Sequence, residues 1–470
     1  MMEGADRILR DPVHGDVPLT DEEMRVLDTP EMQRLRHVRQ LGVTYLVYPG
    51  AQHARFEHSV GTAHLVGLMV EGIERAARRR GATSPVYDRD ALRTLRLAAL
   101  VHDATHLPFG HNIEDQTGLL PRHDRPERFA WLLSDETELG RLLGELGARD
   151  EVLSVLAPEA VGREAPSCRR ELVSGTIDAD LLDYLARDAL FTGLRLGYDP
   201  RIFGVFEAEG PEGRLFVDLG RQGYLKEAVL SEIVRCLEAR FYFSERVYYH
   251  HAKISAGVLV AKAVEIALLE GALSFEDLQR ATDAGLLERL HRIEVRDPER
   301  RRRMAAFLEA LARRRLPKRV AVYPAYANPG VQEELVRRFF GAGSADERRR
   351  VEEGMTADLA RRVGEEVPMT LYCPAGHMQL KQARILVRWP GREDLAPLHA
   401  FRDEVPRLED LERSYARSWK FYVHALSDRP AVLRHAAEVA AEWFPEARNV
   451  LAPPGAGVAE EIRNPGPGVV

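Results

Sequence analysis

Apolar residues recur at helical spacing along most of the first 290 positions. A repeat at i, i+3 and i+4 is typical of amphipathic α-helices. Two helices carry start signals, because Thr20 with Glu23 forms a capping box and Pro30 occupies a first turn. Residues 90–104 are apolar on most faces, which predicts a buried helix. The predicted helices begin at Thr20 and at Pro30 and run over 56–80, 90–104, 125–146, 171–190, 222–268 and 276–290.

Strand patterns are few, and the composition changes after about residue 290. Short strands are predicted at 215–219, 320–323 and 383–389, so the fold class is mainly α. Residues 289–319 contain 12 Arg or Lys and 4 acidic residues, and the apolar repeat weakens beyond them. We therefore expect a helical core over 1–290 and a smaller α+β region over 291–470, whose Gly/Pro-rich end from Pro453 is frayed.

The overall composition narrows the class of protein. Hydrophobic residues at 45% and charged residues at 30% are typical of a globular chain. The apolar runs are far shorter than the roughly 20 residues that span a bilayer, and residues 1–11 contain no signal-peptide core, so we expect a cytoplasmic protein without a membrane partner. The net charge of −7 argues against whole-surface binding of nucleic acid. Three cysteines, Cys168, Cys236 and Cys373, cannot form a disulfide framework. Cys373 and His377 resemble one ligand pair of a zinc site, but the sequence offers no second pair to complete it.

Histidines are concentrated in one region that also contains a buried acid. Seven of the 16 histidines lie between positions 53 and 123. The predicted buried helix ends in His102-Asp103, and an unpaired buried carboxylate costs several kcal/mol, so we expect a bound cation there. Imidazole and carboxylate together suit divalent Fe, Mn, Zn or Mg better than a thiolate-binding metal. His58 and Asp180 are candidates for the remaining ligands. By contrast, four histidines are expected to be structural or on the surface: His14, His37, His53 and His64.

Several motifs follow one another in a recognisable order. They are DPVHG (11–15), DTPEMQRLRHVRQLG (28–42), YPGAQHARFEHSVG (48–61), HDATHLPFGHNIED (102–115), IDADLLDYLARD (177–188) and RFYFSERVYYH (240–250). Together they resemble the HD-domain metal-dependent phosphohydrolase superfamily. Within it they are most similar to the deoxynucleoside triphosphate triphosphohydrolases, which include dGTPase-like enzymes and the catalytic core of animal enzymes with a sterile-alpha-motif domain.

This resemblance implies a role for each matching residue. The implied metal ligands are His58, His102, Asp103 and Asp180. Residues around the phosphates would be His106, His111 and His123, with Glu114 supporting His111, and the phosphate-gripping arginines would be Arg55 and Arg240. Residues beside the sugar and base would be Asp183, Tyr184, Asp188, Gln40 and Leu41.

The implied reaction agrees with the chemistry of these side chains. A bound metal polarises a phosphoryl oxygen and activates water, here for attack on the α-phosphorus of a dNTP. A histidine can protonate the departing 5′ oxygen near neutral pH. We assign this role to His111 and expect it to project from a turn, because Pro108 and Gly110 end the preceding helix. The products would be deoxynucleoside and inorganic triphosphate.

One position departs from the family pattern and keeps alternatives open. Leu181 follows the last predicted ligand, where similar enzymes usually carry Lys or Arg. The lost charge-assisted phosphate contact is worth about 1.5–3 kcal/mol. Other substrates therefore stay open: a monophosphate, a cyclic nucleotide or a guanosine polyphosphate. A protein that only senses nucleotides, or binds nucleic acid through residues 289–319, is a further alternative, but it would not need the complete ligand set.

The resemblance also implies an activator site for GTP or dGTP. Guanine would be recognised by Asp28, Gln33 and Arg36, and the effector phosphates by Arg7, Arg314 and Lys318. Residues so distant in sequence would converge most simply across a subunit boundary, so we expect a homo-oligomer, a dimer or a tetramer. The alternative is that Asp28 only caps the helix at Pro30, and that residues 289–319 are a solvated helix face.

Overall fold

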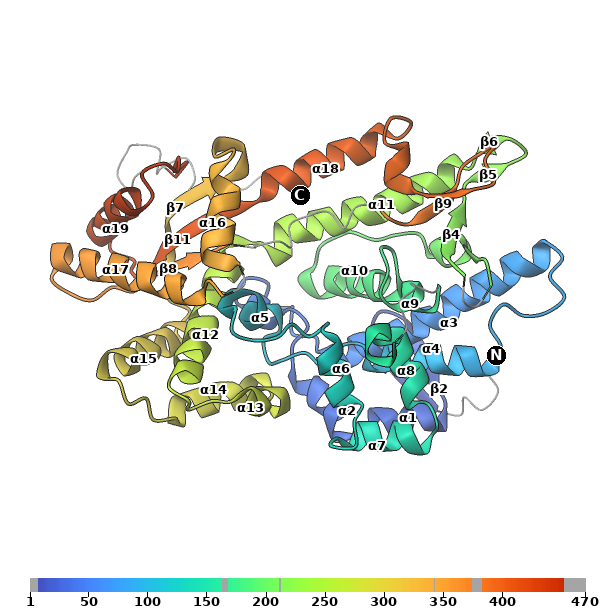
Figure 1. The fold of residues 1–470 in the computed structure, drawn as a ribbon, viewed down its shortest axis with the longest axis horizontal. Coiled ribbons are helices and arrows are strands. Elements are labelled where there is room, and N and C mark those ends of the chain that lie inside the picture. The colour runs from blue at the N-terminus through green and yellow to red at the C-terminus, as the bar shows by residue number, and fades with distance from the viewer. Residues whose placement is uncertain (1–6, 163–167, 211–212, 342, 374–382, 452–470) are drawn as a thin grey trace.

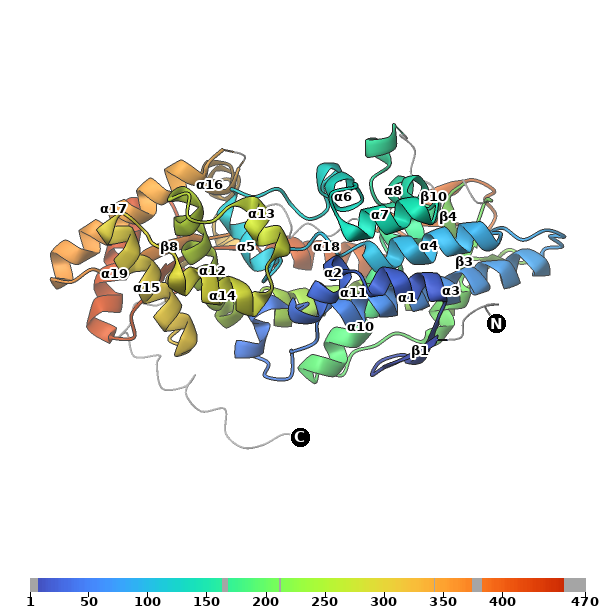
Figure 2. The same cartoon turned by 90° about the horizontal axis from the view of Figure 1, so that it is seen from below.

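The computed structural model describes residues 7–162, 168–210, 213–341, 343–373 and 383–451. It is mainly helical, which confirms the predicted fold class. In the described residues, no helix has the length and apolarity needed to cross a bilayer. The molecule is elongated: helices α1–α4 and α6–α10 lie toward one end, α5 lies near the middle, and many later elements lie at the other end (Figures 1 and 2).

The first end contains the N-terminal hairpin and the helices that carry the histidine-rich region. Its strands and first helices are β1 (Arg7–Asp11), β2 (Gly15–Leu19), α1 (Asp21–Leu27), α2 (Pro30–Arg34), α3 (Arg55–Arg79) and α4 (Arg89–Val101), and α5 (His111–Thr117) follows near the middle of the molecule. The remaining helices are α6 (Pro126–Leu132), α7 (Glu138–Glu145), α8 (Arg149–Leu156), α9 (Cys168–Val173) and α10 (Ala179–Thr192). Helix α3 is central, because both α4 and α10 pack against it.

The rest of the chain adds nine helices and the remaining strands within the described residues. The helices are α11 (Glu227–Phe243), α12 (His251–Leu269), α13 (Phe275–Arg280), α14 (Asp283–Arg292), α15 (Pro298–Ala312), α16 (Val331–Phe340), α17 (Ala345–Val363), α18 (Pro406–Ser418) and α19 (Pro430–Trp443). The strands are β3 (Phe206–Ala208), β4 (Leu215–Asp218), β5 (Gly220–Arg221), β6 (Tyr224–Leu225), β7 (Lys318–Pro324), β8 (Met369–Tyr372), β9 (Leu386–Arg388), β10 (Leu395–Pro397) and β11 (Lys420–Ala425).

Two small sheets contain most of these strands, and β5 and β6 form a separate antiparallel pair. At the second end, β7, β11 and β8 form an antiparallel sheet in that order, against which α17 and α19 pack. At the first end, the order is β10-β9-β4-β3, and β9 pairs parallel with β4. This parallel pair joins residues 216–218 to residues 386–388. The main hydrophobic core accordingly contains residues from Val17 to Val247 and again from Ala383 to Tyr415. The boundary at residue 290 stays a prediction.

Several predicted elements are confirmed, and four long helices are not. The Thr20–Glu23 capping box, α3, α4 and the strands β4, β7 and β9 lie where the pattern placed them. The predicted helices at 125–146, 171–190, 222–268 and 276–290 are each divided into two. Polar caps cause three of the divisions: the side chains of Thr137, Asp178 and Thr282 accept hydrogen bonds from the starts of α7, α10 and α14. A π-helical turn at Ser244–Tyr248 and a break before α12 cause the fourth.

The position of His111 differs from the expected turn. Gly110 adopts φ +47°, which redirects the chain, and His111 then begins helix α5. The strands β1, β2, β3, β5, β6, β8, β10 and β11 were not predicted.

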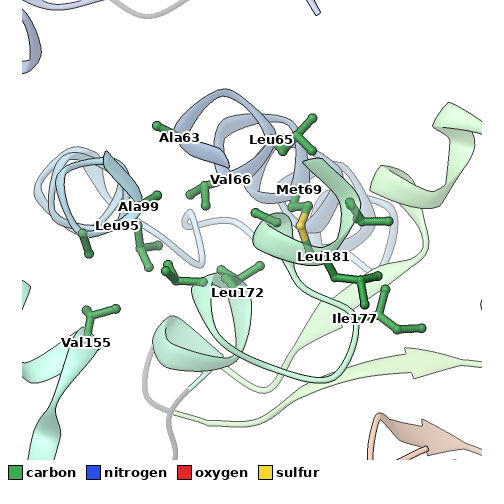
Figure 3. Packing of buried hydrophobic residues seen from close by; sticks show 14 of the residues in the cluster. Ala63, Leu65, Val66, Met69, Leu95, Ala99, Val155, Leu172, Ile177 and Leu181 are labelled. Atoms are coloured by element: carbon green, nitrogen blue, oxygen red, sulfur yellow. The ribbon is translucent and has the colours of Figure 1, made fainter. Parts of the chain in front are cut away.

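The core beneath the histidine-rich region is made by apolar side chains from five helices and a connecting segment (Figure 3). Leu181 belongs to this core and is 2% exposed. It lies near Ile177 and Met69 in Figure 3, so the position that carries Lys or Arg in similar enzymes is occupied here by a core residue.

We predict that Leu181→Lys destabilises the fold instead of adding a phosphate contact. The substitution removes a buried apolar side chain and leaves an ammonium group without a partner, which should lower the free energy of unfolding by about 3–5 kcal/mol. Denaturant unfolding measures this change. Leu181→Met is the control and should cost less than about 1.5 kcal/mol. Equal stabilities for Leu181→Lys and the natural chain would contradict the prediction.

Candidate active site

The four predicted metal ligands come together at the first end of the molecule. Helix α3 supplies His58, the end of α4 supplies His102 and Asp103, and the first turn of α10 supplies Asp180. The Nε2 atom of His58 lies 3.0 Å from Asp180 Oδ1 and 3.7 Å from Asp103 Oδ2. The Nε2 atom of His102 lies 3.6 Å from Asp103 Oδ1 and 3.7 Å from Asp180 Oδ1.

The orientation of the two imidazoles fits a divalent cation. His58 directs Nδ1 at Asp183 Oδ2 (2.7 Å), and His102 directs Nδ1 at the Ala99 carbonyl (2.7 Å). An acceptor at Nδ1 favours the tautomer with hydrogen there, so each Nε2 presents a lone pair to the carboxylates. Both Nε2 atoms are buried and make no hydrogen bond within the described chain. Two Nε2 atoms that face two carboxylates need positive charge between them, from protons or from a bound cation, and this donor set suits a borderline metal such as Fe, Mn or Zn.

The electrostatics of the ligand group also favour positive charge. Burial alone would lower the pKa of His58, but the carboxylates of Asp180 and Asp183 raise it to about 10. Burial likewise opposes the charge on His102, yet Asp103 and Asp180 raise its pKa. For Asp180, burial favours the neutral acid, but His102 and His58 lower the pKa of the carboxyl. The carboxylates therefore remain ionised around the point where the imidazoles converge.

A second group of histidines adjoins the first. The rings of His106 and His123 stack with centroids 3.6 Å apart, and His111 lies 5.2 Å and 5.1 Å from them. One nitrogen of each lies within 4.8 Å of the others, so this group could also hold a metal ion. His106 Nε2 lies 3.4 Å from Asp103 Oδ1, which places the two groups side by side.

The acid that was expected to support His111 supports another histidine. Glu114 Oε2 lies 2.9 Å from His123 Nδ1, and Glu114 Oε1 lies 3.8 Å from His106 Nδ1. His111 instead has Asp115 as its partner, at 3.2 Å from Nδ1. Glu114 thus bonds to His123 in this structure, and its support of His111 stays a prediction. The i,i+4 spacing of His111 and Asp115 on one helix was the available signal for the observed pair.

The two predicted arginines approach the ligand group from different helices. Arg55 is buried at the start of α3; its guanidinium bonds to Asp103 and, at 3.4 Å, to the carbonyl of Gln40. Gln40 Oε1 is buried without a hydrogen bond in the described chain, and Leu41 packs against the main core. Arg240 lies in the last turn of α11, and its guanidinium has no ion pair among the described residues. Burial lowers the pKa of Arg240, but Tyr184 and nearby acidic groups raise it overall.

Asp183 and Asp188 lie beneath the site instead of facing an open space. Asp183 is fully buried, and its oxygens contact His58, His14 and Arg187. Its predicted contact with a sugar is therefore not supported, and its observed position is that of a partner to a metal ligand.

Asp188 is similarly enclosed, at 1% exposure. It lies 2.9 Å from His53 Nε2 and accepts a hydrogen bond of 2.6 Å from the Tyr248 hydroxyl. Tyr184 is less buried and faces Tyr248, with ring centroids 6.2 Å apart. Of Asp183, Tyr184 and Asp188, Tyr184 has the most accessible side chain.

The predicted guanine-binding residues lie together at the junction of α1 and α2. Asp28 is exposed at the C-terminus of α1, whereas Thr29 is the N-cap of α2, so the capping alternative for Asp28 is wrong. Gln33 donates to the Leu27 carbonyl (2.8 Å), and Arg36 donates to Gln33 Oε1 (2.9 Å). Arg7 reaches the start of the same α1 through an ion pair of 3.3 Å with Asp21.

The other two predicted effector residues line a basic cavity elsewhere. This cavity has a volume of about 340 Å³ and lies between the start of α12 and the start of β7. Its cationic or protonatable lining residues are Arg314, Lys318, Arg319 and His251. The half-zinc pattern at Cys373 and His377 cannot be followed, because residues 374–382 lie outside the described part of the chain.

The comparisons with known proteins agree with this arrangement. Residues 55–188 match the HD domain, and residues 225–357 match the HD-associated region. The chain is therefore an HD-domain protein. The first match begins and ends at residues described above, Arg55 and Asp188, and contains all four candidate metal ligands.

The chain is similar to several named relatives over part of their length. It is 31% identical to the uncharacterized protein YwfO of Bacillus subtilis (strain 168) over 260 residues, which are 55% of each chain. It is 31% identical to human deoxynucleoside triphosphate triphosphohydrolase SAMHD1 over 229 residues, 42% of this chain and 35% of that protein. The chain thus spans about half the length, or less, of these relatives. A hypothetical protein from Aquifex aeolicus has the same fold, with a TM-score of 0.64, 20% identity and coverage of 92% of this chain and 99% of that one.

We predict one divalent metal ion per chain at the group of His58, His102, Asp103 and Asp180. Replacing both His102 and Asp103 with Ala removes two ligands, so the purified variant should contain less than a tenth of the metal of the natural protein. Metal analysis by mass spectrometry measures this content. His291→Ala is the control, because His291 is an exposed histidine on α14, outside the group. Equal metal content in the double variant would refute the assignment.

Proposed function

We propose that the protein hydrolyses deoxynucleoside triphosphates to deoxynucleoside and inorganic triphosphate with the help of a divalent metal. The observation that carries the proposal is the adjacency of two groups. The candidate metal ligands His58, His102, Asp103 and Asp180 form the first group. The second group contains three histidines, and its nearest atom, Nε2 of His106, lies 3.4 Å from Asp103 Oδ1. The similarity to triphosphohydrolases over part of the chain supports the choice of substrate.

Each group has a distinct task in the proposed reaction. His58, His102, Asp103 and Asp180 would hold a divalent metal, which would supply the Lewis acidity that polarises the α-phosphate and the attacking water. Arg55 and Arg240 hold phosphate oxygens, since a guanidinium can make two parallel hydrogen bonds, and His106 and His123 lie beside the same oxygens. His111 is the candidate proton donor to the departing 5′ oxygen, because its side chain is 48% exposed while those of His106 and His123 are more enclosed. Tyr184 limits the space beside the sugar.

A role in nucleic-acid binding has less support. Arg289, Arg292, Arg300 and Arg303 of the basic segment each form an ion pair with a neighbouring acid. These pairs reduce the charge available to a phosphate backbone.

We predict that tripolyphosphate is the phosphorus product from dNTPs. The arginines and histidines provide enough positive or protonatable groups to hold three phosphates on one side of the cleaved bond. Ion chromatography of the products, with each dNTP and NTP as substrate, decides the question. Orthophosphate as the sole product would place the cleavage between the β- and γ-phosphates, and pyrophosphate would place it between the α- and β-phosphates. Either result would contradict the proposal.

Regulation by a guanine nucleotide is a second part of the proposal. Its support is the grouping of Asp28, Gln33 and Arg36 on one surface and the basic cavity at Arg314 and Lys318. A carboxylate at Asp28 can accept both N–H donors of guanine, which adenine lacks. Because the two surfaces lie at different places in one chain, a single effector would join them across a subunit boundary, in a dimer or tetramer.

We predict that Asp28→Asn abolishes stimulation by GTP or dGTP. Asp28 is exposed and does not cap α2, so the melting temperature should change by less than about 2 °C. Activity with and without GTP, together with the mass in solution measured by light scattering, tests this point. Asp16→Asn, another exposed acid near the N-terminus, is the control. A natural enzyme whose activity and mass do not respond to guanine nucleotides would end the regulatory proposal and leave the catalytic one intact.

A further inference from the structure

The turn of the N-terminal hairpin reaches the metal-ligand group through one buried carboxylate. Asp183 Oδ2 contacts Nδ1 of His58 at 2.7 Å. Its other oxygen, Oδ1, contacts Nε2 of His14 at 2.6 Å. The side chain of His14 is only 10% exposed, and that of Asp183 is completely buried. A residue from the turn between β1 and β2 therefore shares a carboxylate with a candidate metal ligand.

Arg187 closes this connection into a ring of contacts that runs through Asp183, Arg187, Asp11 and His14. It donates to Asp183 from Nε (2.8 Å) and Nη2 (2.9 Å), and it pairs through Nη1 with Asp11 Oδ2 (2.8 Å). Asp11 in turn accepts hydrogen bonds from the backbone N–H groups of Val13 (2.9 Å) and His14 (2.8 Å). The last residue of β1 thus fixes both Arg187 and the backbone that carries His14.

A glycine on α3 provides the space for this ring. A Cβ atom at Gly61 would collide with Asp183 Oδ1 and with Arg187 Nη2. Because Gly61 lies one turn after His58 on the same helix, the ring fits directly against the backbone that positions that ligand. No larger residue at position 61 is compatible with the observed contacts.

We propose that this ring, and with it the docked N-terminal turn, sets the metal affinity of the protein by positioning His58. The inference rests on the metal site of the proposed function and names His14, Asp11, Arg187 and Gly61 as positioning residues. Asp183 fixes the Nδ1–H tautomer of His58 and its ring angle, so Nε2 keeps its lone pair toward the metal. His14 and Arg187 in turn fix Asp183, which otherwise could rotate away from His58.

Metal binding by the apo protein tests the proposal without any substrate. The full chain is stripped with chelator and titrated with Mn²⁺ by calorimetry. We expect His14→Ala and Gly61→Ala to bind Mn²⁺ about 10- to 100-fold more weakly, the range found when such supporting partners are lost. Asp16→Asn is the matched control, because Asp16 is on the same hairpin but pairs only with the exposed Arg10. Its affinity should stay within twofold of that of the natural chain.

A second readout separates positioning from a purely structural role. The melting temperature of each variant is measured with and without Mn²⁺. The rise on adding Mn²⁺ is then compared between variants, each relative to its own metal-free melting temperature. If the ring only stabilises the fold, His14→Ala and Gly61→Ala melt earlier but keep the natural affinity and the natural Mn²⁺-dependent rise, and the proposal is overturned. If the natural chain binds no Mn²⁺, Zn²⁺ or Fe²⁺, both the proposed metal-dependent function and the positioning proposal are overturned. Weakened binding in both variants, with dNTP hydrolysis absent in the natural chain, would preserve the positioning role and remove the substrate assignment.

Discussion

Asp103 is a carboxylate buried at the end of an apolar helix, and much of the structure is arranged around its negative charge. A buried charge must be paired, because desolvation otherwise costs more than the surrounding packing returns. The partners come from three directions: the Arg55 guanidinium from α3, His106 from the segment before α5, and the imidazoles of His58 and His102. Helices α3, α4 and α10 must therefore keep a fixed mutual position, and the apolar side chains between them provide it.

The length and continuity of each apolar repeat explain which parts of the fold could be predicted from the sequence. The apolar repeats of α3 and α4 are long and uninterrupted, so both helices were predictable. The division of 171–190 into α9 and α10 depends on the side chain of Asp178, which accepts from the backbone of Gly175 and Leu181 and ends one apolar run while starting another. A hydrophobic pattern does not register such a cap. The pairing of the strands was harder still, because β9 finds its partner β4 about 170 residues away, and nothing local indicates that pairing.

The site shows a corresponding limit. The residue types of the ligand group follow from chemistry and from the motifs, and the structure brings these residues together. The supporting contacts do not follow, because neighbours in a motif need not be neighbours in space. Glu114 and Asp115 are adjacent in sequence, yet one faces His123 and the other His111, according to their directions around α5. Asp183 was expected near a sugar together with Tyr184 and Asp188. Instead, its position on α10, three residues after Asp180, turns it toward the inside of the protein, where it contacts His14 of the first motif, DPVHG.

The parallel pairing of β4 with β9 has a consequence for how the chain folds during synthesis. The first end of the molecule contains residues up to Tyr415, so its core lacks β9, β10 and α18 until these residues leave the ribosome. At 5–20 residues per second, the roughly 125 residues after position 290 take about 6–25 s to be made. During this interval β4 has β3 on one side and an unpaired edge on the other, and exposed edges of this kind can pair with other chains. A nascent chain would therefore expose this edge until its last third arrives to close the sheet, and chaperones that cover the edge would limit its pairing with other chains.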